Sequence, residues 1–301
     1  MTKEQKRLAL LRRQRGESTA SVPVDAGIPR LQHDGPVPAS FAQRRLWFLD
    51  RLAPGNPFYT VSLELPLDGV VWPDHLEQSL LEIATRHEAL RTTFAEEDGQ
   101  PVQILHDAPR FPLERIDLSG LSPQAVTERL RALNEEEKNR SFDLTEGPLA
   151  VARLIRVSAS RHLLLLTLHH IVCDGWSLKV LGRELTAIYR ARVAGQPHDL
   201  PDPDVQYRDF AVWQHSLFEG SRMAGHLDYW RTQLAGAPEL ALPVDFQRPA
   251  IPTYGGAFRA IYSRPGLCRR DQRALCRGRV HTFHGPDVGL DGSSGAVCGY
   301  G

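Results

Sequence analysis

A run of apolar residues followed at once by polar ones marks the centre of this chain. Residues 163–168 read LLLLTL, with no alternation, which is typical of a strand buried on both faces. Beyond it, apolar residues recur at helical spacing and predict an amphipathic helix capped by Ser177. These apolar positions are Leu178, Leu181, Leu185 and Ile188. The polar residues in between therefore lie at a strand end and beside a helix N-terminus, whose free N–H groups favour negative charge.

The same periodicities predict strands and helices on both sides of this centre. Alternating apolar positions predict strands at 59–67, 100–105 and 150–157. Helical spacing predicts a helix capped by Ser40, one opened by Pro73, a charged helix after Ser122, and helices at 204–217 and around 227–234. On the helix at 204–217, one face is expected to consist of Tyr207, Phe210, Trp213 and Leu217. Strands and helices alternate without a glycine-rich phosphate loop, which predicts an α/β fold of a non-nucleotide-binding type.

Composition excludes some classes of partner. The 36 basic and 36 acidic residues balance, which gives no electrostatic basis for binding nucleic acid or an anionic membrane. No apolar run approaches the roughly 18 residues of a membrane helix, and the N-terminus has no signal-peptide core. We therefore expect a soluble, cytoplasmic protein. The four cysteines do not form a disulfide framework.

The two ends of the chain differ from the part between them. Residues 1–37 read as a basic leader and a linker rich in Ser, Pro, Gly and Ala, either disordered or joining a neighbouring domain. Residues 264–301 have no useful strand or helix period, which predicts a disordered tail or out-of-frame translation. This tail contains four possible zinc ligands, but their spacing matches no zinc-ligand pattern. They are Cys268, Cys276, His281 and His284.

Candidate chemistry gathers directly after the buried strand, at His169, His170, Cys173 and Asp174. A metal site is disfavoured because adjacent strand residues point to opposite faces, so the two histidines do not readily share one ion. The residues alone leave two readings open, hydrogen-bonded core or rim histidines and a catalytic pair.

Four segments together resemble the condensation domains of nonribosomal peptide synthetases. In chain order they read SFAQRRLWFL at 40–49, RHEALRTTF at 86–94, HHIVCDGWS at 169–177 and YRDFAVW at 207–213. The third is similar to the family's HHxxxDG signature, and the wording is closest to members that join two L-configured residues. The resemblance runs from about residue 36 to about residue 260. It implies an N-terminal lobe at 38–200, the start of a second lobe at 201–263, and a tail at 264–301 that resembles nothing in the family.

The resemblance implies a chloramphenicol-acetyltransferase-like α/β lobe, the N-terminal half of a two-lobed domain. The implied reaction is amide formation between two carrier-bound acyl or aminoacyl thioesters. No cofactor is bound directly, since the substrates arrive on the phosphopantetheine arms of donor and acceptor carrier domains. Neighbouring adenylation or polyketide synthase modules are the other implied partners. Because the family's later motifs are absent, an inactive fragment is an alternative, as is a stand-alone acyltransferase that uses acyl-CoA.

The resemblance also assigns roles to individual residues. His170 is expected to position the attacking amine and accept its proton, and the Gly175 N–H to stabilise the oxyanion. Asp174 is expected to pair with Arg86, a contact whose loss costs roughly 3–5 kcal/mol if buried. His169, Trp176 and Ser177 are expected to support the site by packing or hydrogen bonding.

Overall fold

Hydrogen bonds between the strands build two sheets. The larger sheet has the order β2-β7-β6-β5 and the smaller one β1-β4-β3. Among the strands that the structure describes, β5 and β6 are the one parallel pair and the other pairs are antiparallel. The strands are β1 (Val37–Pro38), β2 (Thr60–Asp68), β3 (Thr92–Glu97), β4 (Gln100–Leu105), β5 (Leu113–Asp117), β6 (Ala150–Arg156) and β7 (Arg161–His169).

The computed structural model describes residues 27–31, 35–218 and 221–238, which belong to one unit. Most of the leader at 1–37, the end of the region at 201–263 and the whole tail at 264–301 lie outside the described residues. The helices are α2 (Phe41–Leu52), α3 (Pro73–Arg86), α4 (Pro123–Lys138), α5 (Gly175–Val193), α6 (Tyr207–Leu217) and α7 (Ser221–Gln233), with a short 3₁₀ helix, η1 (Glu88–Arg91).

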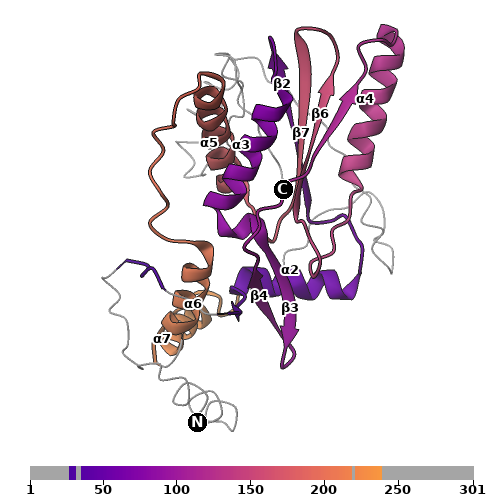
Figure 1. Ribbon diagram of the computed structural model, residues 1–301. Coiled ribbons are helices and arrows are strands. Elements are labelled where there is room, and N and C mark those ends of the chain that lie inside the picture. The colour runs from indigo at the N-terminus through magenta and orange to yellow at the C-terminus, as the bar shows by residue number, and fades with distance from the viewer. Residues whose placement is uncertain (1–26, 32–34, 219–220, 239–301) are drawn as a thin grey trace, which may run out of the picture. The chain divides into compact units, whose positions relative to one another are not determined.

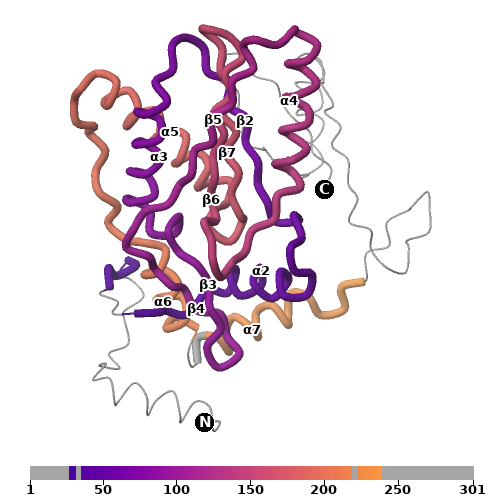
Figure 2. Tube along the Cα trace, turned by 45° about the vertical axis from the view of Figure 1, so that its right-hand side comes forward, coloured from indigo at the N-terminus to yellow at the C-terminus, as the bar shows by residue number. Residues whose placement is uncertain are grey.

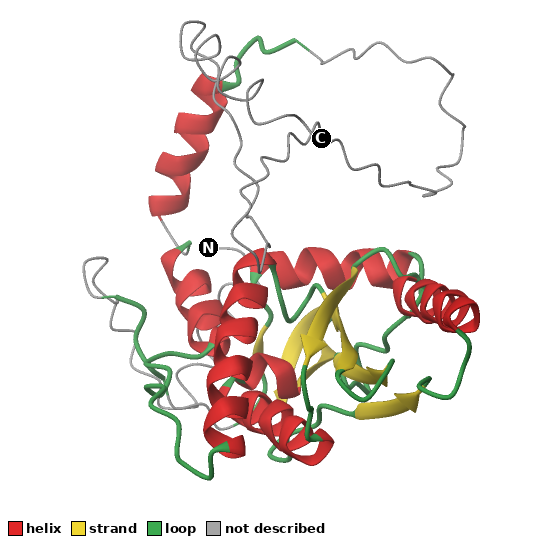
Figure 3. Cartoon of the chain, turned by 90° about the horizontal axis from the view of Figure 1, so that it is seen from above, coloured by secondary structure: helices red, strands yellow, loops and turns green. Residues whose placement is uncertain are grey.

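Helices cover both faces of the larger sheet. In Figures 1 and 2, α3 and α5 lie on one side of the strands and α4 on the other. Figure 3 shows the strands, in yellow, enclosed between the red helices. A hydrophobic core lies on each face of this sheet, and β7 contributes side chains to both. Leu164, Leu166 and Leu168 pack beneath α3 and α5, whereas Leu165 packs beneath α4. The prediction of a strand buried on both faces is confirmed, and each buried leucine contributes about 2 kcal/mol of hydrophobic free energy.

The predicted elements are largely confirmed. Ser40 caps α2 with a capping box, in which its side chain accepts from the Gln43 N–H while the Gln43 side chain accepts from the Ser40 N–H. Ser122 caps α4, and Pro73 begins α3. The edge strand β5 is not predicted, because its side chains alternate poorly and its charged residues pair across the surface.

The buried face of α6 differs from the prediction. The helix begins at Tyr207 rather than at residue 204, and its buried residues are Arg208, Asp209 and Ala211. The predicted aromatic face is only partly buried. The cause is that α6 docks through polar contacts: Asp209 accepts from the Leu31 N–H, and Arg208 donates to the Gly35 carbonyl.

Hydropathy gives no sign of a bilayer-spanning segment in the part of the chain that the structure describes, where none of the helices is long and apolar enough to cross a membrane.

Candidate active site

The two adjacent histidines occupy different environments at the end of β7. His169 is buried, and its Nδ1 accepts a hydrogen bond of 3.1 Å from the Ile171 N–H. Burial, assisted by the neighbouring His170, lowers the pKa of His169 to about 4. His169 is therefore neutral at physiological pH, with its proton on Nε2 and its ring between Tyr59 and Phe142.

His170 faces the opposite way and is exposed. Its backbone N–H donates to the Tyr59 carbonyl at 2.7 Å, which fixes the main chain at this point. Within the described residues, the His170 imidazole has no hydrogen-bond partner. It is therefore the histidine of the pair that can meet a substrate.

The helix N-terminus behind His170 is capped by Asp174, not by Ser177 as predicted. The Asp174 carboxylate accepts from the Ser177 N–H at 2.8 Å and from the Ser177 hydroxyl at 2.6 Å. These bonds hold the pKa of the Asp174 carboxyl below its usual range. Asp174 is the cap because a cap residue directly precedes the first helical residue, here Gly175, and accepts from the N–H of the third, here Ser177.

Gly175 is the first residue of α5, where backbone N–H groups lack partners within the helix. Within the described part of the chain, no acceptor contacts its N–H. A Cβ added at Gly175 would meet nothing within 4 Å, so the space beside this backbone is open. The N–H can therefore donate to a bound oxygen atom.

Cys173 is a buried residue of the histidine loop and takes no part in the exposed chemistry of the site. The Cys173 thiol is buried, contacts the His169 carbonyl at 3.5 Å, and has its pKa raised to about 12 by burial. The thiol therefore stays protonated at neutral pH and does not act as a nucleophile. Across the described ranges no group of three or more His, Cys, Asp or Glu residues could hold an ion. The tail residues from Cys268 to His284 lie outside those ranges.

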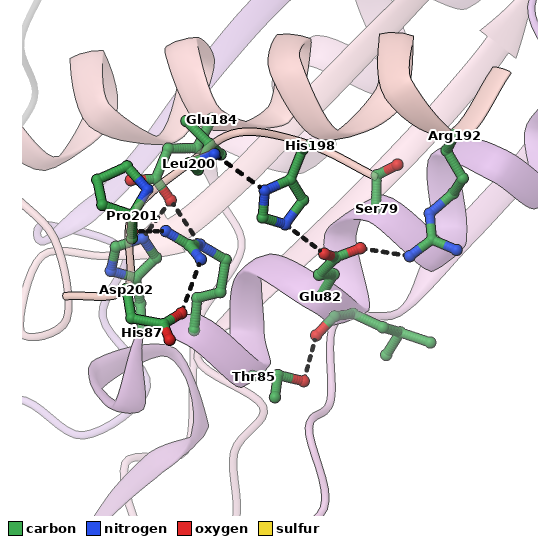
Figure 4. A network of polar contacts seen from close by, with 12 residues as sticks. Ser79, Glu82, Thr85, His87, Glu184, Arg192, His198, Leu200, Pro201 and Asp202 are labelled. Carbon is green, nitrogen blue, oxygen red and sulfur yellow. Dashed lines mark hydrogen bonds and ion pairs between the residues drawn. The ribbon is translucent and has the colours of Figure 1, made fainter. Parts of the chain in front are cut away.

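The expected Arg86–Asp174 ion pair is wrong, because Arg86 binds elsewhere. Its Nε donates to Glu184 on α5 at 3.2 Å, and another guanidinium nitrogen donates to the Pro201 carbonyl at 2.6 Å. Glu184 also accepts from His87 Nε2 at 2.7 Å. Burial alone would raise the pKa of Glu184, but the bonds from His87 and Arg86 outweigh it and the pKa is lowered. Figure 4 shows this network between α3, α5 and the segment that follows α5.

Trp176 also departs from expectation. Its side chain is 75% exposed and does not pack in the core, because the second residue of α5 points away from the sheet. It borders the cavity described below instead.

Three residues outside the predicted site connect α2 to the histidine loop and to α6. Gln43 Nε2 donates to the Ile171 carbonyl at 3.3 Å, and the Ser40 Oγ lies 2.9 Å from the Tyr207 hydroxyl oxygen. Gln43 and Ser40 are both buried. Ser40 and Gln43 belong to the first resembling segment and Tyr207 to the fourth, but no sequence pattern indicates that these segments meet.

A cavity of about 520 Å³ lies where these elements meet. His170, Asp174, Trp176 and Tyr207 line it, together with Gln43 and His87. Most of the remaining lining is apolar, and includes Leu46, Leu90, Leu168, Val172, Leu181 and Val205. An apolar cavity with a few convergent polar groups is typical of a small-molecule site.

Fold and site together define an α/β protein whose exposed histidine and open helix N-terminus face one apolar cavity. Comparison with known families agrees: the Condensation domain family matches residues 33–261, well over half of the chain. The chain therefore belongs to the condensation-domain family of nonribosomal peptide synthetases.

Individual relatives give the same result. One of the linear gramicidin synthase proteins of Brevibacillus parabrevis is 43% identical over 231 residues, which are 76% of this chain and 3% of that synthase protein. Phosphinothricin tripeptide synthetase PhsC of Streptomyces viridochromogenes is 44% identical over 237 residues, or 78% of this chain and 22% of the synthetase. The chain thus spans only a small part of these curated relatives.

Solved structures support the fold. The X-domain from teicoplanin biosynthesis superposes with a TM-score of 0.71 at 29% identity, covering 85% of this chain and 56% of that one. The starter condensation domain of rhizomide synthetase gives a TM-score of 0.62 at 22% identity, covering 68% of this chain and 49% of that one. The expected chloramphenicol-acetyltransferase-like α/β fold is confirmed, and the chain spans about half the length of these solved chains.

Proposed function

We propose that this chain forms an amide bond between two carrier-bound thioesters. The α-amine of an acceptor attacks the thioester carbonyl of a donor; a C–N bond forms, the C–S bond breaks, and the thiol leaves with the proton that the amine releases. The observation that carries the proposal is the exposed His170 imidazole, whose ring has no hydrogen-bond partner within the described residues, beside the open N-terminus of α5 in one apolar cavity.

The residues suit this chemistry. An α-amine has a reference pKa near 8, so it needs orientation more than a strong base. His170 orients the amine and accepts its proton, and the Gly175 N–H donates to the oxyanion. Asp174 holds the loop through Ser177, and His169 supports it from the core. The apolar lining favours donors or acceptors with apolar side chains.

The partners in this proposal are a donor and an acceptor carrier domain, whose phosphopantetheine arms deliver the thioesters. An adenylation or polyketide synthase module neighbours the domain, and the location is the cytoplasm. Support comes from the synthetases that resemble the chain, of which it covers only a segment.

The test is an assay of the 301-residue chain with aminoacyl-loaded donor and acceptor carriers, with product detected by mass spectrometry. We expect amide product, and a rate about 100-fold lower for His170→Ala, since general acid–base groups contribute at least that much. His226→Ala, at an exposed histidine of α7, is the matched control and retains the wild-type rate. An unchanged rate in His170→Ala contradicts the role of His170. Product from acyl-CoA and a free amine indicates a stand-alone acyltransferase.

A second candidate is a docking lobe without chemistry. The X-domain from teicoplanin biosynthesis, solved in complex with OxyB, superposes on 85% of this chain with a TM-score of 0.72. Saturable binding of carriers without amide product supports this candidate over the first.

A further inference from the structure

Tyr207 is a polar residue of the cavity to which neither the resemblance nor the chemistry above gives a role. It is the first residue of α6 and lines the cavity together with His170 and Asp174. The residue is 37% exposed, so a ligand can reach it. Its hydroxyl oxygen lies 2.9 Å from the Oγ of Ser40, which is 167 positions away in the chain.

The hydrogen-bonding needs of the buried Ser40 hydroxyl determine which of the two residues donates in this hydrogen bond. Ser40 is 0% exposed, and its Oγ already accepts from the Gln43 N–H at 3.2 Å. The Ser40 hydroxyl proton needs an acceptor, because a buried donor without one costs about 1–3 kcal/mol. Among the described residues, the Tyr207 oxygen is the one acceptor within reach of it. Ser40 therefore donates to Tyr207.

The Tyr207 proton is then directed away from Ser40. No other hydrogen-bond partner of its hydroxyl is present within the described part of the chain, and the residue lines the cavity. Burial raises the pKa of the Tyr207 phenol above its ordinary value, so the hydroxyl keeps its proton at neutral pH. Tyr207 presents a hydrogen-bond donor to whatever the cavity binds.

The start of α6 is held in place by polar contacts on several sides. Gln206 donates from Nε2 to the Arg86 carbonyl at 2.9 Å and accepts from the Glu88 N–H at 3.1 Å. At the other end of the helix, Gln214 accepts from the Phe41 N–H at 2.9 Å. A donor fixed in advance stabilises developing charge without reorganisation during the reaction.

We propose that Tyr207 is a catalytic hydrogen-bond donor to the carbonyl oxygen of a thioester bound in this cavity. The same bond strengthens when the amine attacks and the carbonyl oxygen becomes an oxyanion, and the phenol keeps its proton throughout. This inference rests on the proposed amide formation and adds to it a side-chain donor as well as the backbone N–H of Gly175.

The experiment follows the carbonyl directly, in the full chain. The probe is S-(2-acetamidoethyl) 3-methylbutanethioate with ¹³C at the thioester carbonyl, whose apolar acyl group suits the cavity. Isotope-edited infrared difference spectra are recorded with the wild type, Tyr207→Phe and the control Tyr229→Phe, an exposed tyrosine of α7. We expect a bound carbonyl band at lower wavenumber in the wild type and in Tyr229→Phe. In Tyr207→Phe the shift is smaller, because only the Gly175 N–H still donates to the carbonyl.

Kinetics provide the second readout. With loaded carriers, Tyr207→Phe is expected to lower kcat about 100-fold, which is typical of removing one oxyanion donor, with little change in KM. Circular dichroism checks that each variant is folded. If Tyr207→Phe is unfolded, Ser40→Ala replaces it, since loss of the Ser40 contact leaves the phenol unoriented and weakens the infrared shift.

The outcomes separate this proposal from the proposed function. A carbonyl shift that decreases in Tyr207→Phe but not in Tyr229→Phe, with no amide product from any variant, supports the donor and contradicts catalysis by this chain. Equal rates and equal spectra in wild type and Tyr207→Phe overturn the donor and leave amide formation standing. A wild type that does not bind the probe at millimolar concentration, or binds it without a shift, also overturns the donor.

Discussion

His169 owes its properties to burial. Its ring lies in the core beneath the loop that carries His170, and its Nδ1 accepts from the Ile171 N–H. Charging this ring would place a cation in an apolar environment, which is why the pKa falls to about 4.

The first prediction concerns the dependence of stability on pH. The unfolded chain protonates this histidine near pH 6.5 and the folded chain only near pH 4. The contribution of neutral His169 to the free energy of unfolding is therefore fully present above pH 6.5 and is lost as the pH falls toward 4. This contribution amounts to about 3 kcal/mol, at roughly 1.4 kcal/mol per pH unit. His169→Asn keeps an acceptor near the Nδ1 position but cannot be protonated. Urea unfolding at pH 7.5 and at pH 4.5 should show that the free energy of unfolding decreases less between these two pH values in this variant than in the wild type. An equal decrease in both proteins contradicts the prediction.

The second prediction concerns the helix cap. Asp174 is exposed and binds Ser177, so its removal does not leave a buried charge unpaired. We expect Asp174→Ala to lower the free energy of unfolding by about 1 kcal/mol, the usual value of an N-cap. Asp174→Asn, which caps equally well, should remain near the wild type. A loss of about 3 kcal/mol or more in Asp174→Ala would indicate a buried ion pair instead.

At the scale of elements, side chains of α3 and α5 hold the segment at 194–206 that leads into α6. Arg86 donates to the Pro201 carbonyl, and His198 Nε2 donates to Glu82 at 2.7 Å. Glu82 also pairs with Arg192 on α5, as Figure 4 shows. Because Val205, Gln206 and Tyr207 line the cavity, these contacts determine the position of one of its walls.

The third prediction tests this network at its most buried member. The side chains of Arg86 and Glu184 are 9% and 8% exposed, and removing one partner of a buried pair leaves the other uncompensated. Glu184→Ala is expected to lower the free energy of unfolding by about 3 kcal/mol. Glu77→Ala, which removes one carboxylate from the exposed pair with Arg115, is the matched control and should cost less than about 1 kcal/mol. Similar losses in urea unfolding of the two variants would show that the Arg86 network is not specially buried.

At the scale of the whole molecule, apolar side chains gather on the surface of α7 and just beyond it. Leu227, Tyr229, Trp230 and Leu234 are between 43% and 61% exposed. Contiguous apolar surface of this kind binds hydrophobic dyes and promotes association.

The fourth prediction follows from that surface. The chain should enhance the fluorescence of anilinonaphthalene sulfonate and associate reversibly in sedimentation velocity. Leu227→Ser combined with Trp230→Ser should reduce both effects. Leu121→Ser, at an exposed leucine remote in sequence from α7, should change neither. Equal dye binding in all three proteins would contradict a patch on α7.

Most of the elements follow from local periodicity. The strand at 163–168, the helix that follows it and the helices begun by Ser40, Pro73 and Ser122 are all present, because the spacing of apolar residues reports directly which face is buried. The edge strand β5 escapes this reasoning, since its burial alternates too weakly to leave a pattern.

The amino-acid sequence by itself determined the α/β order, the strand end that carries His169 and His170, and the family, because these depend on local spacing and on residue identity. Only the tertiary structure decided that Arg86 pairs with Glu184 rather than with Asp174, that Trp176 is exposed, and that Tyr207 forms a hydrogen bond with Ser40. Each of these depends on which distant segments approach one another. A periodic pattern reports how much a side chain is buried, but it does not report which partner buries it.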